Sequence, residues 1–376
     1  MIPPLLKHRL VHLDCLRGVA ALLVCLEHLR AFLFVPFAQL KSLGVFTKGF
    51  YLVTGLGHQA VMIFFVLSGF LVGGSVITAF QSGKWSWKGY LLRRMSRLWV
   101  VLIPALLLTL FWDKLGCGLA PEGYHGAYRI LYNSGPALST PADWSLAAFL
   151  GNTFFLQTIL VPCFGTNGPL WSLANEFWYY LLLPLMITIF APIDTRGRVV
   201  SVLLVASILL FLPKSILVGG LIWLLGALVF FLIRREGIRK IVSHPLWLIF
   251  GFLLTAGCLL ASRSGCMGEG IDLGIGIGCA ALVAALATRA SSNHLYGITS
   301  AGISEMSYTL YLVHFPIMAF FFFVFFKGSQ MAPDGISGLC FFAIIALTIL
   351  YSGATWWLFE RNTDRVRKFI ERRIGC

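Results

Sequence analysis

The stretch Leu13-Asp14-Cys15-Leu16-Arg17-Gly18-Val19-Ala20-Ala21-Leu22-Leu23-Val24-Cys25-Leu26-Glu27-His28 places ionisable side chains inside an apolar run of membrane length. Eleven residues separate Arg17 from His28, which at a rise of about 1.5 Å per residue is roughly 16 Å along a helix. In a hydrocarbon core about 30 Å thick, Arg17 then lies near one face of the bilayer and His28 near its middle. Ionisable groups at that depth are costly and mark functional sites.

The composition predicts an all-α, polytopic membrane protein. Hydrophobic residues make up 58% of the 376-residue chain and charged residues only 12%, whereas soluble domains carry about 25% charged residues. The net charge of +14 is typical of lysines and arginines that hold loops in the cytoplasm. We therefore expect the lipid bilayer, and no nucleic acid, as a partner.

Hydropathy predicts about ten membrane-spanning helices. The predicted segments are 16–36, 58–80, 91–112, 170–192, 199–213, 215–233, 245–262, 271–288, 303–326 and 336–358. Segment 145–160 is also apolar, but Gly151-Asn152, Gln157 and Pro162 favour an interfacial or re-entrant piece over an eleventh span.

The loop charges orient these helices. With the N-terminus in the cytoplasm, 20 of the 29 lysines and arginines fall in inside segments and seven in outside ones, a bias that predicts two cytoplasmic termini. The first helix lacks a small-residue cleavage site and is expected to be retained. We expect one membrane-embedded domain over residues 1–360 and a short basic tail over 361–376 that can lie on the anionic inner leaflet.

The longest outside connection runs from about Asp113 to Pro169. It contains aromatic residues that suit a sugar acceptor or, equally, mark a membrane interface; these are Tyr124, Tyr128, Tyr132 and Trp144. The nine cysteines form no CxxC pair and no Cys/His ligand spacing, so no metal site is predicted.

His28 is the candidate general base, because a neutral imidazole can take a proton from a hydroxyl and return it later. Arg17 lies three turns away on the same face, whereas Glu27 points about 100° away around the helix. The alternative is that His28 only forms a hydrogen bond to another helix, as polar groups in membranes do.

Arg93, Arg94 and Arg97 form a second cluster where the third segment begins. Arg94 and Arg97 share a face at i and i+3 and can bind phosphates bidentately. Positive-inside anchoring is the alternative.

The fourth segment opens with Trp171, and Asn175 and Glu176 follow about one and a half turns into it. A carboxylate at this depth needs a cation or hydroxyl partner. Glu176 is therefore expected to bind acceptor hydroxyls or to brace an imidazolium, and the alternative is a structural salt bridge, for example to Arg30.

Two further stretches carry weaker signals. Ser68-Gly69 is a small pair that favours close helix packing over nucleophilic chemistry. In the ninth segment, polar residues at every third position predict a stripe facing protein or a cavity, with His314 as a second base or ligand: Glu305, Tyr308, Tyr311 and His314.

In this order, these motifs resemble the acyltransferase 3 family of membrane acyltransferases, which includes bacterial O-antigen and polysaccharide O-acetyltransferases. The resemblance covers Leu13 to about Glu360, and the proline often found soon after the helix-three arginines is displaced to Pro104. The matching residues are Arg17 and His28; Arg93, Arg94 and Arg97; Trp171, Ser172, Leu173 and Glu176; and Ser307, Tyr308, Tyr311 and His314.

The resemblance implies a multi-pass protein of the bacterial inner membrane, without the SGNH domain of some relatives. It implies acetyl-CoA as cytoplasmic acyl donor, its phosphates held by Arg93, Arg94 and Arg97. Catalysis is expected from His28, Arg17 and Glu176, and no metal is expected. The residues expected to bind the acceptor are Trp171, Asn175, Tyr308, Tyr311 and His314.

The expected acceptor is a hydroxyl of an extracytoplasmic glycan or lipid-linked sugar, such as O-antigen or capsule, with a macrolide or other secondary metabolite as the alternative. His28 either deprotonates that hydroxyl directly, the route we favour, or carries the acyl group itself. A homo-oligomer is compatible with the sequence. A proton-coupled transporter or flippase is the rival function, but paired repeats and interrupted helices typical of such folds are not evident.

Overall fold

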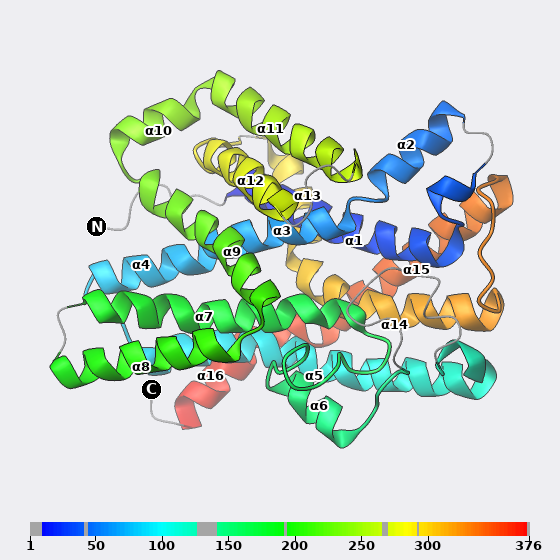
Figure 1. Cartoon of the computed structure of the whole chain (residues 1–376), viewed down its shortest axis with the longest axis horizontal. Helices are drawn as coiled ribbons and strands as arrows, with labels where there is room; N and C mark the ends of the chain where they lie inside the picture. Colours follow the sequence, from blue (N-terminus) through cyan, green and yellow to red (C-terminus); the bar gives the residue numbers. More distant parts are fainter. Residues whose placement is uncertain are drawn as a thin grey trace. The chain divides into compact units, whose positions relative to one another are not determined.

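The computed structural model describes residues 10–40, 44–125, 141–191, 194–264, 270–291 and 293–373. These ranges are almost entirely helical and contain no β-strand (Figure 1), which confirms the all-α class. Tyr128 and Tyr132 of the long connection lie outside the described residues.

The helices are α1 (Val11–Leu33), α2 (Val45–Val53), α3 (Gly57–Ser68), α4 (Gly74–Gln81), α5 (Trp87–Leu119), α6 (Leu146–Thr153), α7 (Trp171–Phe190), α8 (Thr195–Phe211), α9 (Lys214–Leu232), α10 (Glu236–Ser243), α11 (Pro245–Ser264), α12 (Ile271–Ala287), α13 (His294–Glu305), α14 (Ser307–Phe325), α15 (Gly335–Leu358) and α16 (Thr363–Arg373). A π-helical turn, η3 (Gly69–Gly73), joins α3 to α4, and 3-10 turns η6 (Gly168–Leu170) and η8 (Glu360–Asn362) precede α7 and α16.

Several helices begin at a serine or aspartate whose side chain caps the free backbone amides, and these residue types are favoured at that position. Ser86 accepts the amide of Gly89 at the start of α5, and Ser145 does the same for Ala148 at α6. At α15, Asp334 and Ser337 form a reciprocal capping box. The Ser337 amide and hydroxyl hold the pKa of the Asp334 carboxyl below its usual value.

Each of the ten predicted segments falls on one helix or on consecutive helices, and the chain is a membrane protein. Among the residues that the structure describes, seven stretches are long and apolar enough to cross a bilayer: Val45–Gln81, Trp87–Leu119, Gly168–Phe190, Lys214–Leu232, Pro245–Ser262, Ser307–Phe325 and Gly335–Arg373. The remaining three segments fall on α1, which is interrupted by charges, and on α8 and α12, which have 17 residues each. The count of ten and the orientation stay predictions.

Segment 145–160 does not form a spanning helix. Its helical part, α6, has eight residues, about 12 Å at the helical rise, which is far shorter than a hydrocarbon core of about 30 Å. Turns follow it, so the structure agrees with an interfacial or re-entrant piece.

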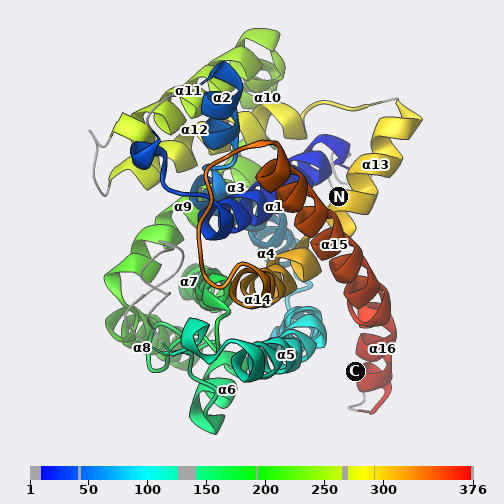
Figure 2. The ribbon, with the colours of Figure 1, turned by 90° about the vertical axis from the view of Figure 1, so that its right-hand side faces the viewer.

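The chain divides into two compact units, each assembled from separate stretches of sequence. The first contains Met1–Ala20, His58–Trp85 and Asn175–Ser304, and the second contains Ala21–Gly57, Ser86–Ala174 and Glu305–Cys376. Within the first, α9 packs on η3 and α12, and α12 packs on α11. Within the second, α14 packs on α5 and α15 (Figure 2).

Two glycines allow the backbone of α9 to touch that of α3 and η3. A Cβ atom at Gly69 would lie 1.8 Å from the carbonyl oxygen of Trp223, and one at Gly226 would lie 2.0 Å from that of Val66. The packing role predicted for Ser68-Gly69 is thereby confirmed. The Ser68 hydroxyl is engaged by the Trp223 indole, 3.0 Å away.

Two helix boundaries differ from the predictions. The ninth segment is broken at Met306, so that Glu305 ends α13 and Tyr308 belongs to α14. The predicted stripe therefore loses Glu305, because a hydropathy window cannot detect a turn between two apolar helices. The third segment begins at Trp87 rather than 91, and its helix continues through Pro104.

Candidate active site

Two histidines from distant parts of the sequence meet within the second unit. The Nδ1 atom of His28, on α1, lies 2.8 Å from Nε2 of His314, on α14. The Nδ1 atom of His314 lies 2.9 Å from the carbonyl oxygen of Leu310. Since a carbonyl only accepts, His314 donates from Nδ1, and its neutral ring must accept at Nε2. His28 then donates from Nδ1, which leaves the lone pair on its Nε2 available as a base.

Burial distinguishes the two rings. His314 is 0% exposed, whereas His28 is only partly buried. The ring of Phe315 meets His28 edge-on, with centroids 5.1 Å apart and planes at 85°, and so restricts its rotation. His314 is thus placed to orient His28, which is the more exposed residue of the two.

A polar contact fixes α14 against the turn that opens α7. The hydroxyl of Tyr311 lies 2.6 Å from that of Ser172 and donates to the carbonyl of Pro169 at 3.1 Å. Both hydroxyls are buried. The Tyr311 hydroxyl is therefore engaged inside the protein, and its contacts support a role in positioning α14, one turn before His314.

Two residues with buried side-chain amides beside this turn were not predicted as site residues. Asn167 donates to the Thr109 hydroxyl at 3.1 Å and to the Leu312 carbonyl at 2.8 Å, and Gln157 donates to the Leu170 carbonyl at 2.9 Å. Their carbonyl oxygens have no partner among the described residues. Because a buried acceptor is costly when unsatisfied, these atoms are able to accept a hydrogen bond from water or a hydroxyl.

A buried carboxylate ties the long connection between α5 and α7 to α5. Asp113 is 0% exposed and accepts from the Trp144 indole at 2.9 Å, from the Thr166 amide at 2.7 Å and from the Thr166 hydroxyl at 2.6 Å. Tyr124 is also fully buried and packs on Phe323. Tyr124 thus serves the packing of this connection, whereas Trp144 is only partly buried.

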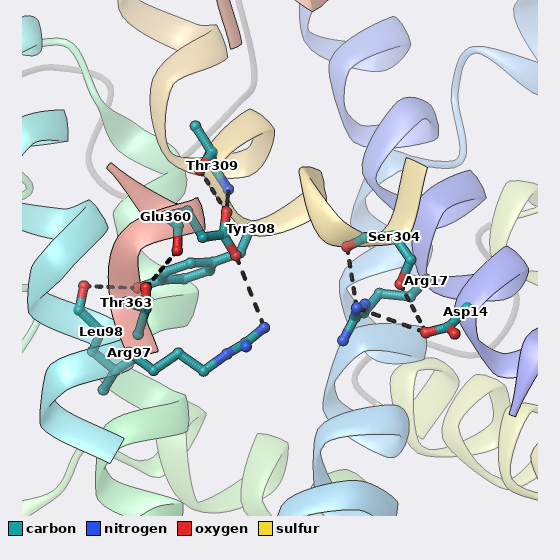
Figure 3. A network of polar contacts seen from close by, with 9 residues as sticks. All are labelled: Asp14, Arg17, Arg97, Leu98, Ser304, Tyr308, Thr309, Glu360 and Thr363. Carbon is teal, nitrogen blue, oxygen red and sulfur yellow. Dashed lines mark hydrogen bonds and ion pairs between the residues drawn. The ribbon is translucent and has the colours of Figure 1, made fainter. Parts of the chain in front are cut away.

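The arginine cluster lies on the surface of α5, where Arg93 and Arg97 are exposed. Arg97 forms an ion pair with Glu360 at 3.9 Å, and the other carboxylate oxygen of Glu360 accepts from the Thr309 amide at 3.1 Å and its hydroxyl at 2.6 Å (Figure 3). The guanidinium of Arg94 lies over the ring of Tyr90, 5.9 Å from its centroid. Glu360 was not predicted as a site residue, because its partners Arg97 and Thr309 lie on other elements, α5 and α14.

Tyr308 belongs to the same network. Its hydroxyl donates to the carbonyl of Leu98 on α5 at 3.3 Å (Figure 3). Tyr308 and the Arg97–Glu360 pair therefore join α14, α5 and η8 within the second unit.

Arg17 lies in the first unit, where its guanidinium donates to the carbonyl of Ser304 at 3.1 Å and lies 3.8 Å from Asp14 (Figure 3). The Ser304 carbonyl is at the C-terminal end of α13, which carries partial negative charge and favours a cation. Helix α1 is continuous from Arg17 to His28, so the predicted common face is retained along the helix.

The remaining predicted residues lie on α7. Trp171 is its first residue, and Asn175 and Glu176 lie one and a half turns in, as predicted. One turn further, Tyr179 donates to the carbonyl of Ile216 at 2.6 Å. Within the described ranges, no three His, Cys, Asp or Glu side chains gather as metal ligands.

Comparison with known proteins places this arrangement in a family. The sequence model of the acyltransferase domain of the acyltransferase 3 family matches residues 10–355. The chain belongs to the acyltransferase 3 family.

Similarity of this acyltransferase 3 protein to individual known proteins is limited to part of its sequence. An uncharacterised protein of Haemophilus influenzae is 29% identical over 153 residues, which cover 40% of this chain and 56% of that relative. The matched region thus spans little more than half of the relative's length. No solved structure matches the chain. Family membership supports a membrane acyltransferase. The donor and the acceptor have to be inferred from the residues of the site.

Proposed function

We propose that this acyltransferase 3 protein transfers an acetyl group from acetyl-CoA to a hydroxyl, with His28 as general base. The observation that supports the proposal is the chain of hydrogen bonds from His28 through His314 to the Leu310 carbonyl. It leaves a lone pair on Nε2 of His28, and a neutral imidazole is well suited to accept a proton near neutral pH.

In the proposed reaction, His28 accepts the proton of the acceptor hydroxyl at Nε2 while the hydroxyl oxygen forms a bond to the thioester carbonyl carbon. The carbon–sulfur bond then breaks, and the His28 imidazolium returns the proton to the departing sulfur. His314 accepts the Nδ1–H of His28 throughout and stabilises the transient imidazolium. One histidine serves as base and then as acid, and no acyl-enzyme is needed.

The arginines of α5 are proposed to bind the donor. Acetyl-CoA carries phosphates that guanidinium groups bind bidentately, and Arg93, Arg94 and Arg97 lie within two turns of one helix. The ion pair between Arg97 and Glu360 is long, at 3.9 Å, and the Arg97 side chain is 48% exposed. Arg97 is therefore able to turn toward a phosphate without leaving a buried cation unpaired.

The proposed acceptor is an extracytoplasmic glycan or lipid-linked sugar, with a macrolide or other secondary metabolite as the alternative, and the proposed location is the bacterial inner membrane. Glu176 is proposed to bind acceptor hydroxyls together with Asn175, and Arg17 to complete the catalytic face of α1. Trp171, Tyr308 and Tyr311 are proposed to shape the surroundings of the acceptor, and a homo-oligomer is compatible with this assignment.

The test is acetyl transfer by the purified full-length protein with labelled acetyl-CoA, comparing the wild type with His28→Ala and with Arg94→Ala plus Arg97→Ala. We expect His28→Ala to lose about 10²–10⁴-fold in turnover while it still binds CoA. The double arginine variant is expected to weaken CoA binding. His12→Ala, on the same helix, and Arg198→Ala are matched controls expected to resemble the wild type.

If the protein retains the acetyl label in the absence of acceptor, the reaction proceeds through an acyl-enzyme and not by direct transfer. If both site variants transfer like the wild type, the site assignment is wrong. If the wild type neither binds nor cleaves an acyl-CoA, flux measurements in sealed vesicles would test the transporter alternative.

A further inference from the structure

A cavity of about 800 Å³ opens within the first unit, between α4, α7, α9 and α12. Its lining is apolar except for Gln81, and it includes Ile77, Leu183, Leu224 and Ile277. Leu228 and Ile277 on its rim are 49% and 46% exposed, so the cavity opens on the outer surface of this unit. Its volume falls in the range of about 300–1,000 Å³ that small-molecule sites occupy.

Two arginines border this apolar space. The Arg234 guanidinium donates to the lining residue Gln81 at 2.5 Å. The Arg235 guanidinium lies over the ring of Phe231, another lining residue, 5.5 Å from its centroid. Both follow the last turn of α9, where the negative end of the helix dipole attracts cations.

These two arginines carry positive charge that no carboxylate of the described residues neutralises. In the part of the chain that the structure describes, the ion pairs involve other residues, and neither Arg234 nor Arg235 has a carboxylate partner. Arg235 is exposed and Arg234 is partly exposed. Two cations at the mouth of a hydrocarbon-lined cavity are complementary to an amphiphile with an anionic head and an apolar tail.

We propose that this cavity binds an anionic phospholipid, with the phosphate at Arg234 and Arg235 and an acyl chain along Leu224 and Leu228. The source of the ligand is the surrounding bilayer, and basic pockets between membrane helices bind anionic head groups in this way. The site is separate from the proposed catalytic residues and does not depend on the proposed function.

The head group, and not the acyl chain, should determine which lipid binds. Lipid tails are as apolar as leucine, so an acyl chain gains little by leaving the bilayer for this cavity. Discrimination must therefore come from the head group. Each arginine near an anionic surface contributes enough to change affinity by about fivefold, so binding should depend on head-group charge much more than on chain length.

The experiment uses the full-length protein in nanodiscs that contain a phosphatidylglycerol with a photoreactive group at the end of one chain. Labelled peptides are identified by mass spectrometry, and unlabelled phosphatidylglycerol or phosphatidylcholine is added as competitor. We expect labelling on α9 and α12, competed by phosphatidylglycerol and at least fivefold less effectively by phosphatidylcholine.

Matched variants separate the head-group and tail contributions. Arg234→Gln with Arg235→Gln should abolish the preference for phosphatidylglycerol, whereas Arg239→Gln with Lys240→Gln on α10 removes the same charge and should leave it intact. Leu224→Trp fills the cavity and should reduce labelling without changing charge. The proposal is overturned if the two lipids compete equally, or if the arginine variant keeps the wild-type preference for phosphatidylglycerol. It is also overturned if Leu228→Cys crosslinks two copies of the chain and lipid labelling is lost.

Discussion

The Nδ1 atom of His28 lies 2.8 Å from Nε2 of His314, and the second nitrogen of His314 is held by the Leu310 carbonyl 2.9 Å away. This relationship assigns distinct parts to the two rings. His314 is proposed to position His28 with the lone pair on its Nε2, and His28 is the residue proposed to meet the substrate.

Replacing His314 tests that division. We expect His314→Ala to lower turnover by about 100-fold or more without changing CoA binding, because the imidazole of His28 loses the acceptor that fixes its tautomer. His314→Gln should recover part of the loss, since its amide oxygen can accept from His28. The measurement is turnover against pH with CoA binding in parallel, and an unchanged pH profile in His314→Ala would refute the assignment.

Glu360 offers a test of donor binding. Its carboxylate faces both Arg97 and the backbone of Thr309. Glu360→Gln should leave Arg97 free for phosphate and lower the KM for acetyl-CoA several-fold, an effect limited by the solvent exposure of Arg97. Glu371→Gln makes the same change of charge on α16 and should not change the KM.

The same glutamate also contributes to stability. Glu360→Ala removes the buried acceptor of the Thr309 amide and hydroxyl, which should cost about 1–3 kcal/mol; thermal unfolding in detergent measures it. A rise in KM with Glu360→Gln would contradict competition for Arg97 and would make Glu360 a residue that orients it.

Asp113 should control the order of the connection between α6 and α7. Asp113→Asn places an amide group where the Thr166 and Trp144 donors converge, and we expect a loss of about 2–4 kcal/mol. Hydrogen exchange should rise between residues 143 and 167 while α14 stays protected. Thr166→Val loses the hydrogen bond from the hydroxyl and keeps the one from the amide, so it should have an intermediate effect. Equal exchange in the wild type and the two variants would contradict this role of Asp113.

The sequence predicts the helices better than their contacts. Hydropathy locates each apolar segment, and helical periodicity places Arg17 and His28 on one face, because both depend on neighbours within a few turns. The pairing of His28 with His314 joins residues 286 positions apart, and periodicity carries no information on which helix packs against which. Glu360 and Asp113 were missed for the same reason, since their partners lie on other elements.

The last prediction concerns the contact of α9 with α3 and η3. A Cβ atom at Gly226 would lie 2.0 Å from the Val66 carbonyl oxygen and 2.7 Å from the Phe70 amide nitrogen. These are backbone atoms that cannot rotate away, so Gly226→Ala must separate the helices at a cost of about 1–3 kcal/mol or more. Gly257→Ala, in α11, has no atom within 4 Å of its added Cβ and should be neutral or slightly stabilising, because alanine favours helices. Thermal unfolding of the two variants in the same detergent makes the comparison, and equal midpoints would show that the two backbones do not approach this closely.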